Sequence, residues 1–270
     1  MRLAFLVAYF GTDFYGSQVQ PGLRTVEGDM AQACMRLGIF EDWREAGFAF
    51  SGRTDRGVHA RGQVCAFTTP QPDRAVAKLN AVLPHDCWCR GWAKADPSFH
   101  PRYSARRRTY RYYLHDPLLD DDLLAEAAAC FPGTHDFSCF ARLEGKNPVR
   151  TIHTAEVVPE GDFRIFEIQG ESFLWNMVRC IATSLILAGR GEMAAAEIRS
   201  LLATGKGRHL PPAPPDALVL WDIDCGIDFI PMDMGIRRRD AVTEQRRRYA
   251  SLKKVTDCIP IPDGQEHRRE

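Results

Sequence analysis

The alternation of apolar and polar positions predicts a first set of strands and helices in the N-terminal half of the chain. Strands are expected over residues 3–9, 47–51, 63–68 and 87–95, and helices over 25–37 and 75–83. Thr25 is expected to cap the first helix, because its hydroxyl can accept a hydrogen bond from the first helical turn. This order, β-α-β-β-α-β, is that of the split unit of ferredoxin-like folds.

The C-terminal half repeats that order. Strands are expected over residues 108–115, 152–158, 163–168 and 217–224, and helices over 118–130, 173–187 and 194–202, with Ser172 as the cap of the second helix. We therefore predict an α+β fold of two ferredoxin-like (βαββαβ) domains, residues 1–104 and 105–226. They are expected to join into an extended, mostly antiparallel sheet with helices on one side and a cleft between the domains. Residues 227–270 are expected to form an Arg-rich tail with a helix near 241–254.

The charges are balanced in number but unevenly placed. The 270 residues include 35 Lys and Arg and 35 Asp and Glu, which gives no net charge. Arginines nevertheless gather at positions 102, 106–108 and 111, and basic residues recur in the tail at 237–239, 246–248 and 253–254. Because phosphates are bound by local basic patches, this arrangement favours a polyanionic partner.

Several classes of protein and site are not expected. No apolar stretch is long enough to cross a bilayer. The nine cysteines lack paired C-x-x-C spacing, which is typical of small buried residues in a reducing compartment. We therefore expect a cytoplasmic protein that does not bind membranes. The scattered histidines supply no metal site, and the sequence has no glycine-rich phosphate loop for a nucleotide cofactor.

The most distinctive stretch is SGRTDRGVHA, residues 51–60. It follows an apolar segment with the character of a strand, so Asp55 is expected on a loop at the end of that strand. Arg53 and Arg56 flank the carboxylate closely enough to hold it ionised. For a D-R-G triplet alone, an ordinary turn with an ion-paired Asp and Arg is the commoner explanation. The ten-residue string as a whole is much more specific.

Two further stretches contain candidate chemistry. In RRRTYRYYL, residues 106–114, Tyr110 and Tyr112 share one face of a strand with Arg108, either as core residues or as an aromatic surface for a base. In FLWNMVRCI, residues 173–181, Arg179 adjoins an apolar helical face. Its guanidinium must therefore either reach solvent or pair with a buried anion.

Together these stretches resemble the TruA-type tRNA pseudouridine synthases. Residues 52–59 match the family pattern G-R-T-D-x-G-V-H, and residues 173–179 match F-x-x-x-M-V-R. The resemblance implies that Asp55 is the catalytic carboxylate and that Arg179 is its ion-pair partner. It also implies that Tyr110 stacks on the target base and assists removal of the proton from C5.

The resemblance further implies a partner and a set of contacts. The family acts on tRNA as a homodimer, without a metal or nucleotide cofactor, and isomerises uridines at positions 38 to 40 of the anticodon stem-loop. An apolar wall beside the base is implied at Leu218 or Leu220. RNA contacts are expected from Arg53, Arg56, His59, Arg102, Arg106, Arg107 and Arg108.

The resemblance covers about residues 3–225 and has departures. Ser17 stands where the family commonly has Trp, and Phe10 stands where an Asp is usual, so the first loop is expected to grip RNA differently. A non-catalytic protein that binds single-stranded RNA through ferredoxin-like domains is the alternative, because such domains bind by base stacking alone. Asp55 discriminates between the two, since a pure binder has no need of a carboxylate that repels phosphate.

Overall fold

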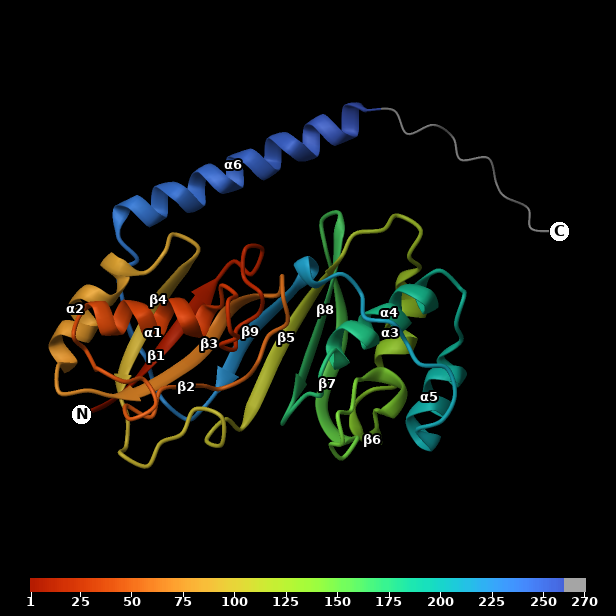
Figure 1. Ribbon diagram of the computed structural model, residues 1–270. Coiled ribbons are helices and arrows are strands. Elements are labelled where there is room, and N and C mark those ends of the chain that lie inside the picture. The colour runs from red at the N-terminus through yellow and green to blue at the C-terminus, as the bar shows by residue number, and fades with distance from the viewer. Residues whose placement is uncertain (260–270) are drawn as a thin grey trace. The chain divides into compact units, whose positions relative to one another are not determined.

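A ten-stranded sheet runs through the computed structural model of the chain, which describes residues 1–259 (Figure 1). The chain divides into two units, Met1–Asp233 with the sheet and Met234–Glu270 with the long helix α6 (Ile236–Cys258). Residues 227–233, which were expected to begin the tail, belong to the first unit. Strand β10 (Ile230–Pro231) in this segment pairs with β4 (Cys87–Lys94) at the edge of the sheet.

The remaining elements of the first unit follow the predicted order closely. The N-terminal half contains β1 (Arg2–Tyr9), α1 (Val26–Arg36), β2 (Ala49–Phe50), β3 (His59–Thr68) and α2 (Pro72–Val82) before β4. The C-terminal half contains β5 (Arg107–Leu114), α3 (Asp121–Ala128), β6 (Gly133–Asp136), β7 (Val149–Glu160), β8 (Phe163–Gly170), α4 (Met177–Gly189), α5 (Ala195–Thr204) and β9 (Leu218–Asp224). Short 3-10 helices lie at η1 (Ser138–Phe140) and η2 (Pro215–Ala217). Thr25 caps α1 as predicted, because its hydroxyl accepts from the Gly28 N–H at 3.2 Å.

The strand order is β10-β4-β1-β3-β9-β5-β8-β7-β6, with β2 paired to β3. Neighbouring strands are antiparallel except β3 and β9, which pair in parallel and join the two halves of the sequence. The predicted α+β class with a mostly antiparallel sheet is therefore confirmed. The join also needs a glycine, because a Cβ on Gly62 would lie 2.6 Å from the carbonyl oxygen of Trp221 in β9.

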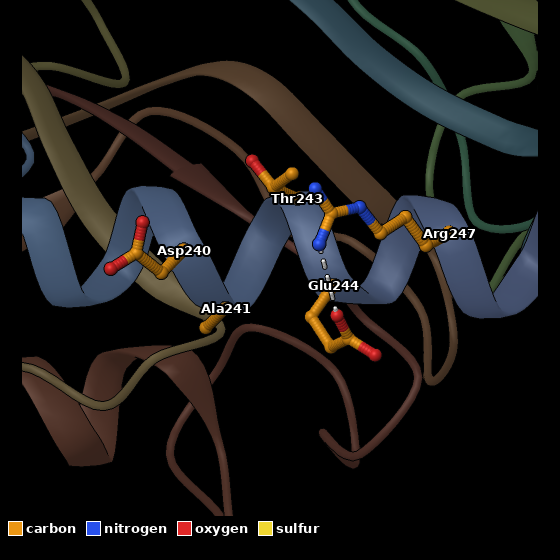
Figure 2. A pocket seen from close by; sticks show the side chains of 5 residues that line it. All are labelled: Asp240, Ala241, Thr243, Glu244 and Arg247. Carbon is orange, nitrogen blue, oxygen red and sulfur yellow. Dashed lines mark ion pairs between the residues drawn. The ribbon is translucent and has the colours of Figure 1, made fainter.

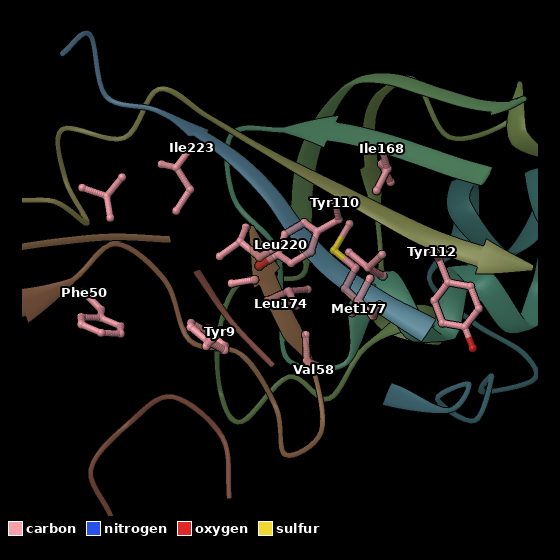
Figure 3. Close-up of a cluster of buried hydrophobic side chains, with 14 of the residues drawn as sticks. Tyr9, Phe50, Val58, Tyr110, Tyr112, Ile168, Leu174, Met177, Leu220 and Ile223 are labelled. Atoms are coloured by element: carbon pink, nitrogen blue, oxygen red, sulfur yellow. The ribbon is translucent and has the colours of Figure 1, made fainter. Parts of the chain in front are cut away.

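A row of buried side chains crosses the sheet at this join. Tyr9 is opposite Ala60, Ala60 is opposite Leu220, Leu220 is opposite Tyr110, and Tyr110 is opposite Ile168. Residues in register on adjacent strands point to the same face, so the row runs through five strands and both halves. Figure 3 shows Tyr9, Leu220, Tyr110 and Ile168 following one another in this cluster. All five are buried and form the apolar floor on which the site is built.

Two predicted boundaries are wrong, and two strands were not predicted, for identifiable reasons. Helix α4 begins at Met177 rather than at residue 173, because Asn176 takes a left-handed conformation at φ 63° and Ser172 is not its cap. Strand β3 begins at His59 rather than at residue 63, since its first residues pair with β9 instead of with a neighbour in the sequence. Strands β6 and β10 were not predicted, being too short to show a period of two.

Candidate active site

The loop that carries Asp55 is held to the sheet at its first residues. The Ser51 N–H donates to the carbonyl of Val64 at 2.8 Å, and the side-chain amide of Gln63 donates to the carbonyl of Gly52 at 2.8 Å. Gln63 is fully buried, so this bond is protected from water. The start of the loop is therefore fixed by the strand β3 that also leads the chain away from the site.

The middle of the loop is held by the segment that follows β1. The Thr54 N–H donates to the Ser17 hydroxyl at 2.9 Å, and the Ser17 N–H donates to the Thr54 carbonyl at 3.1 Å. The hydroxyl of Thr54 also shares a 2.8 Å hydrogen bond with that of Tyr9. Gly11 lets the two segments approach, because a Cβ there would lie 2.1 Å from the carbonyl oxygen of Val58. These contacts hold both the backbone and the side chain of Thr54, the residue that precedes Asp55.

Asp55 and Arg179 form the ion pair that the sequence predicted. The Arg179 Nη1 lies 3.1 Å from Asp55 Oδ2 and 3.2 Å from Asn176 Oδ1, while its Nε donates to the carbonyl of Ala213 at 2.6 Å. The side chains are 14% exposed for Arg179 and 24% for Asp55, so the pair is accessible on the carboxylate side. A carboxylate that a reactant can reach is thereby held by a guanidinium from the opposite half of the sequence.

Tyr110 lies beside this ion pair in the buried row. Its ring meets that of Phe173 edge to face, with 5.1 Å between the centroids. Burial raises the pKa of the Tyr110 phenol to about 12, with Arg108 lowering it and the Asp55 charge raising it by smaller amounts. The hydroxyl is therefore protonated at neutral pH. Tyr112, two residues along the same face, is anchored differently, since its hydroxyl donates to the carbonyl of Pro214 at 3.1 Å.

The two arginines that flank Asp55 do not pair with it. Arg53 and Arg56 are both exposed, and the Arg56 guanidinium lies over the ring of Tyr15, 4.3 Å from its centroid. The expectation that both arginines hold Asp55 ionised is therefore not met, because Arg179 takes this position. Arg53, Arg56 and Tyr15 instead form an exposed basic and aromatic rim next to the loop.

Arg108 was expected to contact RNA, but the structure buries it. Its guanidinium donates to three backbone carbonyls, those of Ser51, Arg102 and Glu171, and its side chain lies beneath the loop. Desolvation lowers its pKa, although an arginine remains charged under all ordinary conditions. Arg108 therefore links the Asp55 loop to β5 and is not available to a phosphate. Of its neighbours, Arg102 and Arg106 are exposed and Arg107 is paired with Asp224 at 3.0 Å.

His59 is likewise enclosed at the end of the loop. Its Nδ1 accepts from the Gly11 N–H at 3.1 Å, which fixes the neutral ring with its proton on Nε2. Burial lowers the pKa of His59, with a smaller opposing effect from a hydrogen bond to the backbone of Asp216. The ring thus joins the segment after β1 to the segment before β9. Leu218 and Leu220, the expected apolar wall, are both buried in β9.

Several supporting residues were not identified as such from the sequence. Ser17 was noted only as a departure from a family pattern, and Gln63, Asn176 and Ala213 carried no signal of their role. Ser17 and Ala213 act through hydrogen bonds to residues 37 and 34 positions away, Gln63 through one to a residue 11 positions away, and Asn176 through one to a residue in the next helical turn. Such contacts depend on tertiary placement, which local periodicity does not encode.

Comparison with known proteins identifies the class. The family model described as tRNA pseudouridine synthase matches residues 127–224. A tRNA pseudouridine synthase A of Methanoculleus marisnigri is 51% identical over 269 residues, covering 100% of this chain and 98% of the relative. The enzyme of the same name from Methanosphaerula palustris is 51% identical over 92% of this chain and 88% of the relative. That from Thermococcus sibiricus is 46% identical over 85% and 87%.

These matches place the chain among the pseudouridine synthases. The chain belongs to the tRNA pseudouridine synthase A family, the TruA type, as its SGRTDRGVHA stretch suggested. Among solved structures, a chain of "Crystal Structure of a Cbf5-Nop10-Gar1 Complex" matches 80% of this chain and 47% of that chain. Its TM-score is 0.36 at 14% identity, which is too remote to bear on the site.

Proposed function

We propose that this protein isomerises uridine to pseudouridine in the anticodon stem-loop of tRNA, at positions 38 to 40, without a cofactor. The observation that carries the proposal is the ion pair between Asp55 and Arg179 beside the buried ring of Tyr110. A protein that only binds RNA gains nothing from a carboxylate held in this way, since the charge repels phosphate. The names and identities of the relatives support the same conclusion.

The reaction sets clear demands on these residues. The bond from ribose C1′ to base N1 breaks, the base turns, and C1′ bonds to C5, which then loses its proton while N1 gains one. Asp55 acts as the charged carboxylate, either by adding to the substrate or by taking a proton from the ribose. Arg179 holds the Asp55 carboxylate through one hydrogen bond to its Oδ2, and its bonds to Asn176 and to the Ala213 carbonyl fix the guanidinium in place.

Tyr110 supplies the surface on which the detached base is held. Its ring is rigid because it packs between β8, β9 and Phe173, and a stacked base keeps its contact with the ring while it turns. The raised pKa of its phenol keeps the hydroxyl protonated before substrate binds. Assistance with removal of the C5 proton then requires that the phenol act through a hydrogen bond or ionise within the complex. Leu218 and Leu220 form the apolar wall beside the base.

Contacts to the RNA backbone fall on the exposed arginines. Arg53 and Arg56 stand at the rim of the Asp55 loop, and Arg102, Arg106 and Arg107 follow at the start of β5. His59 and Arg108 act indirectly, by holding the loop in place. In this division the exposed arginines bind phosphate, while the half-buried His59 and the buried Arg108 fix the loop geometry.

We further propose the finer organisation that the family implies. Residues 1–104 and 105–226 form two ferredoxin-like domains, with helices on one side of the sheet and the base entering a cleft between them. This is supported by the βαββαβ order of the first half and by the same order in the second half with β6 and α5 added. The resemblance also supports a homodimer, and sedimentation would measure the oligomeric state. A cytoplasmic location is supported by the burial of eight of the nine cysteines. No helix within the described residues is long and apolar enough to span a membrane.

An Asp55→Asn variant tests the proposed function. It should lose pseudouridine formation on an unmodified tRNA transcript by at least about a thousandfold while keeping tRNA affinity within about threefold, because volume is kept and no phosphate contact is removed. Asp121→Asn is the matched control, since it breaks another Asp–Arg pair, with Arg164 at 2.7 Å, on the protein surface. Activity of Asp55→Asn within tenfold of the wild type would refute the assignment. Mapping the positions of pseudouridine in the product tRNA tests whether the modified uridines lie in the anticodon stem-loop.

A further inference from the structure

Helix α6 carries a charge that the rest of the chain does not share. Its 23 residues include eight Arg and Lys but three Asp and Glu, a net charge of +5. Because the whole chain has 35 residues of each sign, everything outside α6 has a net charge of −5. A protein whose proposed substrate is a polyanion thus concentrates its excess positive charge on one helix.

The basic residues of α6 are ordered along the helix. Arg239, Arg246 and Lys253 recur every seven residues, so they follow one ridge with steps of about 10 Å. All three are exposed, and Tyr249, which is 53% exposed, lies between the last two on the same side of the helix. A ridge of cations with an interleaved aromatic ring matches the combination that binds RNA through phosphates and stacked bases.

Two of the three acidic residues of α6, Asp240 and Glu244, lie on a different side of the helix, whereas Asp257 follows Lys253 by four residues at the C-terminal end of the ridge. Figure 2 shows Asp240 and Glu244 one helical turn apart, with Arg247 turned back to Glu244 at 3.6 Å. Both partners of this ion pair are 74% exposed, so it contributes little to stability. Three cations and one carboxylate thus lie along the ridge of Arg239, Arg246 and Lys253, so its net charge is positive.

The apolar residues of α6 do not favour another kind of partner. Val242, Tyr249, Leu252 and Val255 are spaced seven, three and three residues apart, so they drift around the helix instead of forming one stripe. A membrane-binding helix needs a continuous apolar face, and a paired helix needs a sustained seam. Charge is the property in which α6 is unusual.

We propose that α6 is an RNA-binding extension whose ridge of Arg239, Arg246 and Lys253 contacts phosphates of the same tRNA whose uridine reaches Asp55. This inference rests on the proposed function, because it takes tRNA as the substrate. The ridge supplies phosphate contacts and none of the chemistry assigned to Asp55, Arg179 and Tyr110. Its loss should therefore raise KM and leave turnover at saturating tRNA unchanged.

The test compares two triple variants of the full chain with equal loss of charge. Arg239→Gln/Arg246→Gln/Lys253→Gln removes the ridge and keeps helix propensity, because Gln is a good helix former. Lys78→Gln/Lys146→Gln/Lys206→Gln removes three exposed lysines elsewhere. Affinity for an unmodified tRNA transcript is measured across a sodium chloride series, with circular dichroism to verify folding and sedimentation to verify the oligomeric state.

The ridge variant should reduce the slope of log affinity against log salt by about 2, since each lost phosphate contact removes about 0.7–0.9. The lysine control should change the slope by less than half of that amount. Equal changes in the two variants, or an unchanged slope in the ridge variant, would overturn the proposal. A ridge variant that changes only the sedimentation would show that α6 joins copies of the chain instead. Pseudouridine formation by the wild-type protein is measured in parallel. If the wild type is active, a negative result with the ridge variant counts against the role of α6 and not against the proposed function.

Discussion

Arg179 offers the sharpest test of how the site is held together, because one guanidinium makes three contacts in different directions. Its Nη1 reaches Asp55 and Asn176, and its Nε reaches the carbonyl of Ala213. The Ala213 N–H returns a bond of 3.1 Å to the Arg179 carbonyl. The residue therefore couples the catalytic carboxylate to the start of α4 and to the segment that leads into β9.

The expected cost of Arg179→Ala follows from this geometry. Breaking a fully buried ion pair costs about 3–5 kcal/mol, and a hydrogen bond to a charged group contributes about 1.5–3 kcal/mol. Asp55 keeps 24% of its side chain exposed, so water replaces part of the lost interaction. We therefore expect a loss of about 2–3 kcal/mol, which for a unit of this size lowers Tm by about 4–12 °C.

Arg179→Lys separates charge from geometry. A lysine keeps the positive charge, but its ammonium is a single point and cannot reach Asp55 and the Ala213 carbonyl in the fixed arrangement of a planar guanidinium. The expected result is a smaller loss of stability than in Arg179→Ala, together with a fall in kcat of at least about tenfold. Thermal unfolding and single-turnover pseudouridine formation measure the two effects, with Arg164→Ala as the control for a surface ion pair with Asp121.

Two outcomes would refute this reasoning. If Arg179→Lys kept kcat within twofold of the wild type, the forked geometry would have no part in the reaction. If Arg179→Ala were no less stable than Arg164→Ala, the three contacts of Arg179 would make no particular contribution to stability. A double-mutant cycle with Asp55→Asn adds a direct measure of the pair, since residues in contact show a coupling energy of about 0.5–3 kcal/mol.

Two further substitutions test the floor and the loop. Tyr110→Phe should keep the stacking ring and tRNA affinity but lower kcat by at least about tenfold, because it removes only the hydroxyl. Tyr112→Phe is the control, and an unchanged kcat in Tyr110→Phe would limit Tyr110 to stacking. Ser17→Ala leaves the Thr54 N–H without its acceptor in a buried position. The free energy of unfolding should therefore fall by about 1–3 kcal/mol, and kcat should fall as well. Ser17→Thr, which keeps the hydroxyl, should reverse both effects. Loss of stability in Ser17→Ala with unchanged kcat would give Ser17 no part in placing Asp55.

The sequence predicted those features that depend on local patterns. Alternation along residues 106–114 placed Tyr110 and Tyr112 on the buried face of β5, and Thr25 was correctly identified as a cap. The predicted pair of Asp55 and Arg179 is also present, although it rested on a family resemblance together with the general need of a buried arginine for an anion.

The features that the sequence did not predict depend on side-chain contacts and backbone conformations that the local pattern does not show. Arg108 has the sequence context of a basic patch, yet three carbonyls from separate segments enclose its guanidinium. Similarly, the start of α4 is set by the left-handed conformation of Asn176, which directs its side chain to Arg179 and leaves Phe173 against Tyr110. A charge run or an apolar helical period does not reveal either arrangement, because both are fixed by packing in three dimensions.

The position of Asp55 depends on both halves of the sequence at once. The loop is bonded to Ser17 and Gln63 on the N-terminal side, and to Arg108 and Arg179 on the C-terminal side. In contrast, the backbone pairing that joins the halves spans only two residue pairs between β3 and β9. Side chains beneath and beside the loop must therefore supply much of the alignment. Displacement of a catalytic group by about 1 Å can cost about a hundredfold in rate. Loss of any one of these bonds should therefore reduce turnover strongly in a protein that is still folded.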